Sequence, residues 1–159
     1  MKRAAGKPSV TGKRSLRLWL RLLGCSTLIE QHVRTRLRDT FRVTLPQFDV
    51  LAELDAAGAP QTMSALSRRL MVSNGNVTGV IDRLERVGLV QRTPSTEDRR
   101  VHYIALTPHG RRRFAAMAAA HEGWVDALLG ELDDADRLVR LLERTKQHLR
   151  AQVTTREAT

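Results

Sequence analysis

Cysteine is almost absent from this sequence. Its 159 residues include one cysteine, Cys25, so the chain cannot form an internal disulfide. The five histidines include no pair four residues apart, and no Cys and His pair has the spacing of zinc ligands. The sequence therefore predicts no metal site and no cofactor, and it is typical of a protein from a reducing compartment.

Long apolar runs and catalytic motifs are missing as well. No run approaches the ~20 apolar residues that a membrane span needs, and residues 1–13 lack the apolar segment of a signal peptide. No glycine-rich phosphate loop follows a predicted strand, and no nucleophile and base can be paired from their spacing. We therefore expect a cytoplasmic protein that has no membrane partner and is not an enzyme.

Acidic residues are scarce relative to basic ones. The chain has 27 Lys and Arg against 17 Asp and Glu, which gives a formal net charge of +10. The excess lies in two zones, because residues 1–42 contain 11 basic and 2 acidic residues and residues 88–113 contain 6 and 2. Separate basic zones are expected of a chain that meets a polyanion, such as nucleic acid, with particular surfaces.

Most of the chain has the apolar period of a helix. The patterns predict helices at about residues 15–38, 47–57, 63–70, 74–87, 108–128 and 133–149. A threonine cap followed by a first-turn proline supports two of these starts, at Thr44 and Thr107. Between the fourth and fifth helices, the β-prone residues 89–93 and 101–106 predict a two-stranded hairpin with a charged tip.

The order of these elements predicts a mainly α fold with a small β-hairpin wing. Residues 45–107 contain a three-helix unit followed by a charged hairpin, which is the arrangement of a winged helix-turn-helix. The apolar faces of residues 15–44 and 108–152 are too long for this module to cover, and a second copy of the chain is the economical partner. We therefore expect a homodimer in which residues 1–14 are a disordered basic tail.

The second helix of the helix-turn-helix, in the stretch MVSNGNVTGVIDRLERVG at residues 71–88, would enter the DNA major groove. The predicted buried face consists of Val77, Val80, Ile81, Leu84 and Val87. The opposite face carries amides and small groups, although each of its two glycines destabilises an exposed helix by roughly 1 kcal/mol. Amides can bond adenine edges, threonine can touch a thymine methyl, and glycine lets the backbone approach DNA. The candidate DNA-contacting residues are Ser73, Asn74, Gly75, Asn76, Thr78 and Arg83.

The predicted hairpin tip carries Asp98, Arg99 and Arg100. Arginines at such a tip can reach phosphates or a narrow minor groove. The neighbouring Asp98 can hold one guanidinium in position through a bidentate pair. Because this tripeptide in a loop is usually a solvated turn, its significance comes from its position after a recognition helix.

Together these segments resemble the MarR family of bacterial regulators. The resemblance lies in LPQFDVL at 45–51, LSRRLMVSNGNVTGVIDRLERVGLVQR at 66–92 and DRRVHYIALTPHG at 98–110, and it extends over about residues 15–150. It implies an obligate homodimer with intertwined terminal helices on a pseudo-palindromic operator in double-stranded DNA. It also implies that Arg100 is the wing arginine and Asp98 its orienting partner. The implied major-groove contacts are Asn74, Asn76, Thr78 and Arg83, whereas Gly79 stands where other members place a long basic side chain.

The resemblance also implies a small effector, often aromatic, bound where the terminal helices meet the DNA-binding module. Four arginines within nine residues of the first helix suit a multiply anionic ligand, although they could instead contact the DNA backbone. The sequence is similar to the branch that senses CoA thioesters of hydroxycinnamates, so an aromatic acid or its CoA thioester is the expected effector. The candidate ligand residues are Trp19, His32, Arg34, Arg38, Arg42, Phe48 and Phe114. For the aromatic residues and His32, a place in the core is the favoured alternative.

These features predict a ligand-released repressor of a catabolic or resistance operon, and two alternatives stay open. One is redox sensing through Cys25, but related sensors surround the thiol with tyrosines and the one tyrosine here, Tyr103, lies in the wing. A buried structural cysteine is therefore expected. The other alternative is an architectural protein that binds DNA without sequence choice, which would lose affinity equally on all sequences as salt rises.

Overall fold

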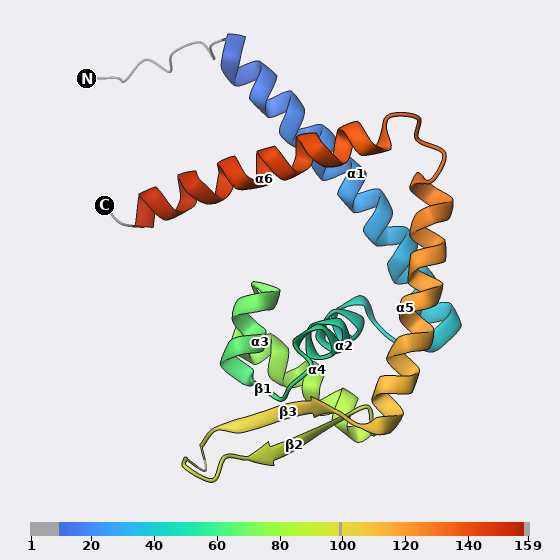
Figure 1. The fold of residues 1–159 in the computed structure, drawn as a ribbon, viewed down its shortest axis with the longest axis vertical. Coiled ribbons are helices and arrows are strands. Elements are labelled where there is room, and N and C mark those ends of the chain that lie inside the picture. Colours follow the sequence, from blue (N-terminus) through green and yellow to red (C-terminus); the bar gives the residue numbers. More distant parts are fainter. Residues whose placement is uncertain (1–9, 99, 158–159) are drawn as a thin grey trace, which may run out of the picture. The chain divides into compact units, whose positions relative to one another are not determined.

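A computed structural model describes residues 10–98 and 100–157 (Figure 1). The chain divides into two compact units, with the boundary between Glu122 and Gly123. The first unit contains α1 (Val10–Phe41), α2 (Leu45–Ala57), β1 (Gln61–Thr62), α3 (Met63–Leu70), α4 (Asn74–Arg86), β2 (Val90–Pro94), β3 (His102–Leu106) and most of α5 (Pro108–Leu129). The second unit contains the end of α5 and all of α6 (Ala135–Glu157). The chain is mainly helical, as the sequence predicts.

The predicted caps start the helices of the first unit. At α2, the Thr44 N–H donates to the side-chain oxygen of Gln47 at 2.8 Å, and Pro46 lies in the first turn. At α3, the hydroxyl of Thr62 accepts the N–H of Ala65 at 3.2 Å. These side chains satisfy backbone groups that would otherwise lack partners at a helix start. Threonine residues therefore mark where α2 and α3 begin.

The core of the module lies between α2, α3, α4 and the sheet. Its fully buried members include Leu51, Leu66, Ile81 and Ile104, one from each of these elements. Burial of such a side chain stabilises the fold by about 1.5–3 kcal/mol. The prediction for Val87 is wrong, because α4 ends at Arg86 and the Val87 side chain is 59% exposed.

The wing is a three-stranded antiparallel sheet in the order β1-β3-β2, not the two-stranded hairpin expected. Gln61 and Thr62 pair with Ile104 and Tyr103, while β2 and β3 pair from Val90 opposite Leu106 to the wing tip. A strand of two residues is too short to give a period-of-two signal, which is why β1 was not expected. Because β1 directly precedes α3 and pairs with β3, the sheet connects the wing to the start of α3.

A tight joint connects the wing to α5. The Thr107 hydroxyl donates to the Gly88 carbonyl at 2.7 Å and accepts the Gly110 N–H at 2.9 Å. A Cβ atom on Gly110 would lie 1.9 Å from the carbonyl oxygen of Leu89, so only glycine fits. The LTPHG sequence therefore holds the start of α5 against the end of α4.

Two terminal predictions need correction. Helix α1 begins at Val10, five residues before the expected start, and residues 1–9 of the predicted tail lie outside the described residues. Helix α6 begins at Ala135, two residues after the expected start, and continues to Glu157. A helix can propagate through polar residues that bury nothing, so the apolar period underestimates its length. Within the described ranges, no helix is long and apolar enough to cross a membrane.

Candidate DNA-binding surface

Helices α3 and α4 form a helix-turn-helix whose turn is made by residues 71–73. Met71 adopts a left-handed conformation with φ of 54°, and the Ser73 hydroxyl accepts the Asn76 N–H at 3.4 Å. Val77 and Ile81 are buried against the module. Because side chains three and four residues apart share a helix face, this packing turns the other face of α4 outward.

The predicted DNA-contacting residues of α4 lie on this outward face. The exposed ones are Ser73, Gly75, Asn76, Thr78 and Arg83. The side chain of Asn74 lies outside what the structure describes. Ser73 has a second role, because its hydroxyl caps the helix. The face offers amide and hydroxyl groups together with one guanidinium, which are groups that can bond base edges in a major groove.

The fold does not require the two glycines of α4. A Cβ atom built on Gly75 or Gly79 would have no neighbouring atom within 4 Å, and neither glycine has a positive φ. Alanine at either position would fit and would favour the helix by about 1 kcal/mol. Packing therefore gives no reason for these glycines, whereas a close approach of the α4 backbone to a partner would.

Ser95 and Asp98 order the wing tip by accepting hydrogen bonds from backbone N–H groups. The Asp98 carboxylate accepts the backbone N–H of Arg100 at 2.9 Å, and the Asp98 carbonyl accepts that of Val101 at 2.9 Å. The Ser95 hydroxyl accepts the N–H groups of Glu97 and Asp98. Asp98 thus holds the backbone beside Arg100, whose side chain is exposed, and its pair with a guanidinium stays a prediction. Arg99 lies outside the described residues.

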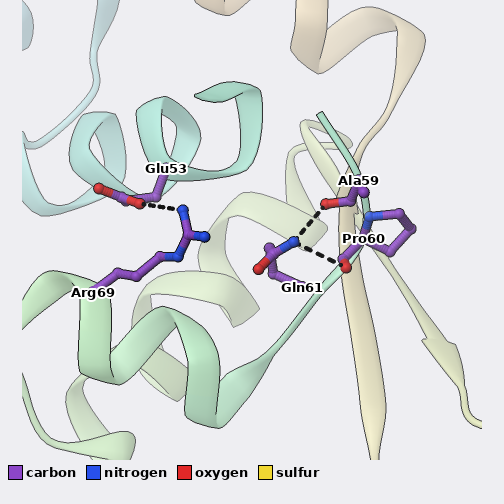
Figure 2. Close-up of polar contacts among 5 residues, drawn as sticks. All are labelled: Glu53, Ala59, Pro60, Gln61 and Arg69. Atoms are coloured by element: carbon purple, nitrogen blue, oxygen red, sulfur yellow. Dashed lines mark hydrogen bonds and ion pairs between the residues drawn. The ribbon is translucent and has the colours of Figure 1, made fainter. Parts of the chain in front are cut away.

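Part of the basic charge of α3 is bound within the module. Arg69 pairs with Glu53 of α2 at 3.4 Å, as Figure 2 shows, so its charge is partly neutralised. The same view shows the Gln61 amide donating to the carbonyls of Ala59 and Pro60 at 3.1 and 3.2 Å, which fixes the chain before α3. Arg68, by contrast, is exposed and makes no ion pair with any described residue.

A pocket of about 350 Å³ lies between α2 and α4. It is lined by Pro46, Asp49, Val50, Leu70, Val72, Asn76, Val77, Val80 and Arg83. Burial raises the pKa of Asp49, and the carboxylates of Glu30 and Glu53 raise it further. Asn76 and Arg83 belong both to this pocket and to the outward face of α4. None of the seven predicted ligand residues lines it.

The predicted ligand residues are only partly brought together. Phe48 and Phe114 are buried, with ring centroids 5.6 Å apart, and the Phe48 ring lies 5.0 Å from that of His121. These rings form an aromatic cluster in the core. His32 is half-buried, and Trp19 is 57% exposed.

Two of the predicted ligand arginines of α1 are exposed and pair with carboxylates. Arg34 pairs with Glu30 at 3.7 Å, and Arg38 pairs with Asp39 at 3.1 Å. Arg42 is exposed at the end of α1, with φ of 59°. Exposed pairs of this kind are weak, so these guanidinium groups can exchange their partners for another anion.

Cys25 is exposed in this chain, so the expectation of a buried cysteine is wrong for the isolated chain. The apolar period placed Cys25 within a helix, but periodicity does not show which residues of a helix are covered. No group of three or more His, Cys, Asp or Glu side chains that could hold a metal ion occurs among residues 10–98 and 100–157.

Three residues beside this surface were not among the predicted site residues. Arg92 of β2 forms ion pairs with Asp82 and Glu85 of α4, which joins the recognition helix to the wing. The sequence does show that Asp82 and Glu85 lie three residues apart, and so on the same side of a predicted helix. This spacing indicates that one basic side chain could pair with both carboxylates. Their partner lies on a strand, and only the fold brings it close.

Comparisons with known proteins agree with this geometry. A sequence model of the MarR family matches residues 43–102. The transcriptional activatory protein BadR of Rhodopseudomonas palustris is 35% identical over 121 residues, which are 74% of this chain and 69% of BadR. The HTH-type transcriptional regulator PecS of Dickeya dadantii is 34% identical over 113 residues, which are 70% of this chain and 63% of PecS.

A solved structure shows a similar fold on its nucleic-acid partner. Reduced AbfR bound to DNA superposes with a TM-score of 0.68 at 28% identity, covering 86% of this chain and 94% of AbfR. Helix-turn-helix and wing therefore occur in this chain in the same arrangement as in a protein solved on DNA.

Proposed function

The chain belongs to the MarR family of DNA-binding transcriptional regulators, which are not enzymes, and we propose that it is a homodimeric repressor released by a small effector. It would bind a pseudo-palindromic operator in the cytoplasm, where the bacterial chromosome lies. The observation that carries the proposal is the outward face of α4, where the exposed amide of Asn76 and two glycines that packing does not require suit close contact with base edges.

The exposed apolar side chains of the long helices support a homodimer. In α1, Leu16 and Leu20 are each more than half exposed, and in α6 Leu141 and Leu149 are half exposed or more. Apolar patches of this extent mark an interaction surface. A twofold dimer would place two copies of α4 about one DNA turn apart, near 34 Å, which matches two half-sites of an operator.

For the effector, we propose an aromatic acid or its CoA thioester, bound by Trp19, His32, Arg34, Arg38, Arg42, Phe48 and Phe114. The exposed arginines of α1 support a ligand with several phosphates, such as CoA, because guanidinium groups bind phosphate bidentately. The test is thermal shift with benzoate, hydroxycinnamates and their CoA esters. Stabilisation by the thioesters and not by free CoA supports this effector class, and stabilisation by free acids alone would remove the role of the arginines.

The proposed function is tested by selecting binding sites from a pool of random DNA duplexes with the full-length protein. A sequence-specific dimer should enrich a pseudo-palindrome whose half-sites lie one turn apart. Its affinity for the enriched duplex should exceed that for a shuffled duplex by about 10³-fold or more. Equal affinity for both duplexes at every salt concentration would identify an architectural DNA-binding protein instead.

The direction of regulation needs a separate test, since BadR is named an activatory protein. A reporter downstream of the enriched site should be repressed by the protein and released by the effector. Activation of the reporter would overturn the repressor assignment while leaving DNA recognition intact.

A further inference from the structure

Arg92 of β2 holds two carboxylates of the recognition helix. Its Nη2 forms an ion pair with Oδ1 of Asp82, and its Nε lies 3.3 Å from Oε2 of Glu85. The other carboxylate oxygen of Glu85 accepts the backbone N–H of Arg92 at 3.3 Å. Glu85 thus binds both the backbone and the side chain of Arg92, and α4 and β2 are joined at three points.

The Nε side of the Arg92 guanidinium is buried in the protein. The Arg92 side chain is 28% exposed, and its Nε atom is buried without a hydrogen bond of good geometry. The carboxylate of Glu85 is therefore the group that balances the charge at Nε. The carboxylates of Asp82 and Glu85 are 47% and 40% exposed, so the buried part of the cluster is the Nε side of Arg92. Loss of the Glu85 carboxylate would leave that buried N–H without a polar partner, which is unfavourable.

The cluster lies between the two parts of the surface that would read DNA. Asp82 and Glu85 belong to the helix that carries Asn76 and Thr78, and Arg92 belongs to the strand that leads to the wing tip. Base recognition by α4 and phosphate contact by the wing must occur together, and a small misplacement of one weakens both. The angle between helix and wing is therefore part of recognition.

We propose that Arg92 is a positioning residue for sequence-specific DNA binding, which acts through Asp82 and Glu85 and not by contacting DNA. This inference rests on the proposed function. For the removal of a carboxylate from this surface, the positioning role and simple electrostatics predict opposite changes in DNA affinity. Removal of a carboxylate from a DNA-binding face should strengthen binding to all DNA, because it removes repulsion of the phosphates. Removal of a carboxylate that fixes the wing should weaken binding to the operator.

The test compares Glu85→Gln with the wild type on two duplexes, the one enriched from a random pool and the same duplex in shuffled order. We expect about a tenfold loss of affinity for the enriched duplex and no loss for the shuffled one. The matched control is Glu97→Gln, since Glu97 is an exposed wing residue whose carboxylate pairs with no described residue. This control should bind both duplexes as tightly as the wild type or slightly more tightly.

Arg92→Lys separates positioning from a phosphate contact. Lysine keeps the charge but cannot hold two carboxylates in a fixed fork, so the preference for the enriched duplex should fall while the salt dependence of binding stays unchanged. A direct phosphate contact predicts instead that Arg92→Lys resembles the wild type and that Arg92→Gln lowers the salt slope by about 0.9. Circular dichroism and thermal melting would confirm that each variant is folded.

The possible failures are distinguishable. If Glu85→Gln binds both duplexes more tightly, as Glu97→Gln does, the positioning role is refuted while the proposed function stands. If the wild type shows no preference for any duplex, the proposed function fails, and the inference fails with it.

Discussion

At the scale of single residues, the two glycines of α4 separate the requirements of folding from those of binding. Both positions are open, so the fold would accept a methyl group at either one. Gly110 shows the opposite case, because the carbonyl oxygen of Leu89 occupies the space that a Cβ atom would need. The sequence singled out Gly75 and Gly79, but only the surroundings of each glycine show which are needed for packing.

Gly79→Ala is expected to stabilise the folded chain by about 1 kcal/mol and to weaken operator binding. The reason is that alanine favours the helix, whereas its methyl group obstructs the approach of the α4 backbone to base edges. Urea unfolding and binding to the enriched duplex measure the two effects. Gly123→Ala in α5 is the matched control, since its Cβ position is equally open, and it should stabilise without changing DNA affinity. A Gly79→Ala protein that binds DNA as the wild type does would contradict a close approach at this residue.

Asp49 predicts a dependence of stability on pH. Its pKa is raised above the ordinary value of 3.8 by burial, Glu30 and Glu53. Between these two pKa values the folded chain binds more protons than the unfolded chain, so stability falls as pH rises through that window. The contribution is fully present below pH 3.8 and is lost above the raised pKa.

Asp49→Asn should therefore melt at a higher temperature than the wild type at pH 7, and the difference should shrink as pH falls toward 4. Thermal melting at several pH values measures this. A variant that is less stable than the wild type at pH 7 would show that the Asp49 carboxylate has a stabilising partner, contrary to the structure.

At the scale of elements, capping residues and apolar period predicted most of the module. Thr44 marks the start of α2 as expected. Thr62 and Gly58 mark the start of α3 and the end of α2, through a side-chain hydrogen bond and a left-handed φ that their residue types favour. Strand β1 and the ion pairs of Arg92 with Asp82 and Glu85 could not be predicted, since both depend on contacts between segments that are distant in the chain. Local physics thus predicts where elements begin, while tertiary pairing determines what they contact.

Gly110→Ala should destabilise the joint between the wing and α5. Its Cβ atom would overlap the Leu89 carbonyl oxygen, a backbone atom that cannot move without shifting the end of α4. We expect a loss of about 1–3 kcal/mol in the free energy of unfolding, measured by urea titration. An unchanged unfolding midpoint would mean that the joint is looser than its geometry indicates.

At the scale of the whole molecule, the isolated chain leaves many apolar side chains of α1 and α6 in contact with water. The sequence predicted this excess from the length of the apolar faces, and it predicted a second copy of the chain as the cover. The positions of these leucines identify the faces, but they do not define how two copies meet. The geometry of that contact depends on two molecules, so it cannot be derived from the apolar period or from the structure of one chain.

Leu20→Glu is expected to weaken or abolish the dimer without unfolding the module, because Leu20 is 54% exposed and lies outside the buried core. Analytical ultracentrifugation should show the mass of the dimer for the wild type and a shift toward the monomer for the variant. Val87→Glu is the matched control, since Val87 is 59% exposed but lies at the end of α4. If both variants sediment as the wild type does, α1 does not form the dimer interface.

The central claim is that the outward face of α4 reads base sequence, and binding-site selection with the Asn76→Ala protein tests it most directly. Asn76 should account for the preference at one base position of each half-site. The variant should therefore lose selectivity there by roughly 1–3 kcal/mol and keep the other positions, whereas Arg100→Ala should weaken all sequences alike. An Asn76→Ala protein that selects the same site as the wild type, with a uniform loss of affinity, would contradict base reading by this helix.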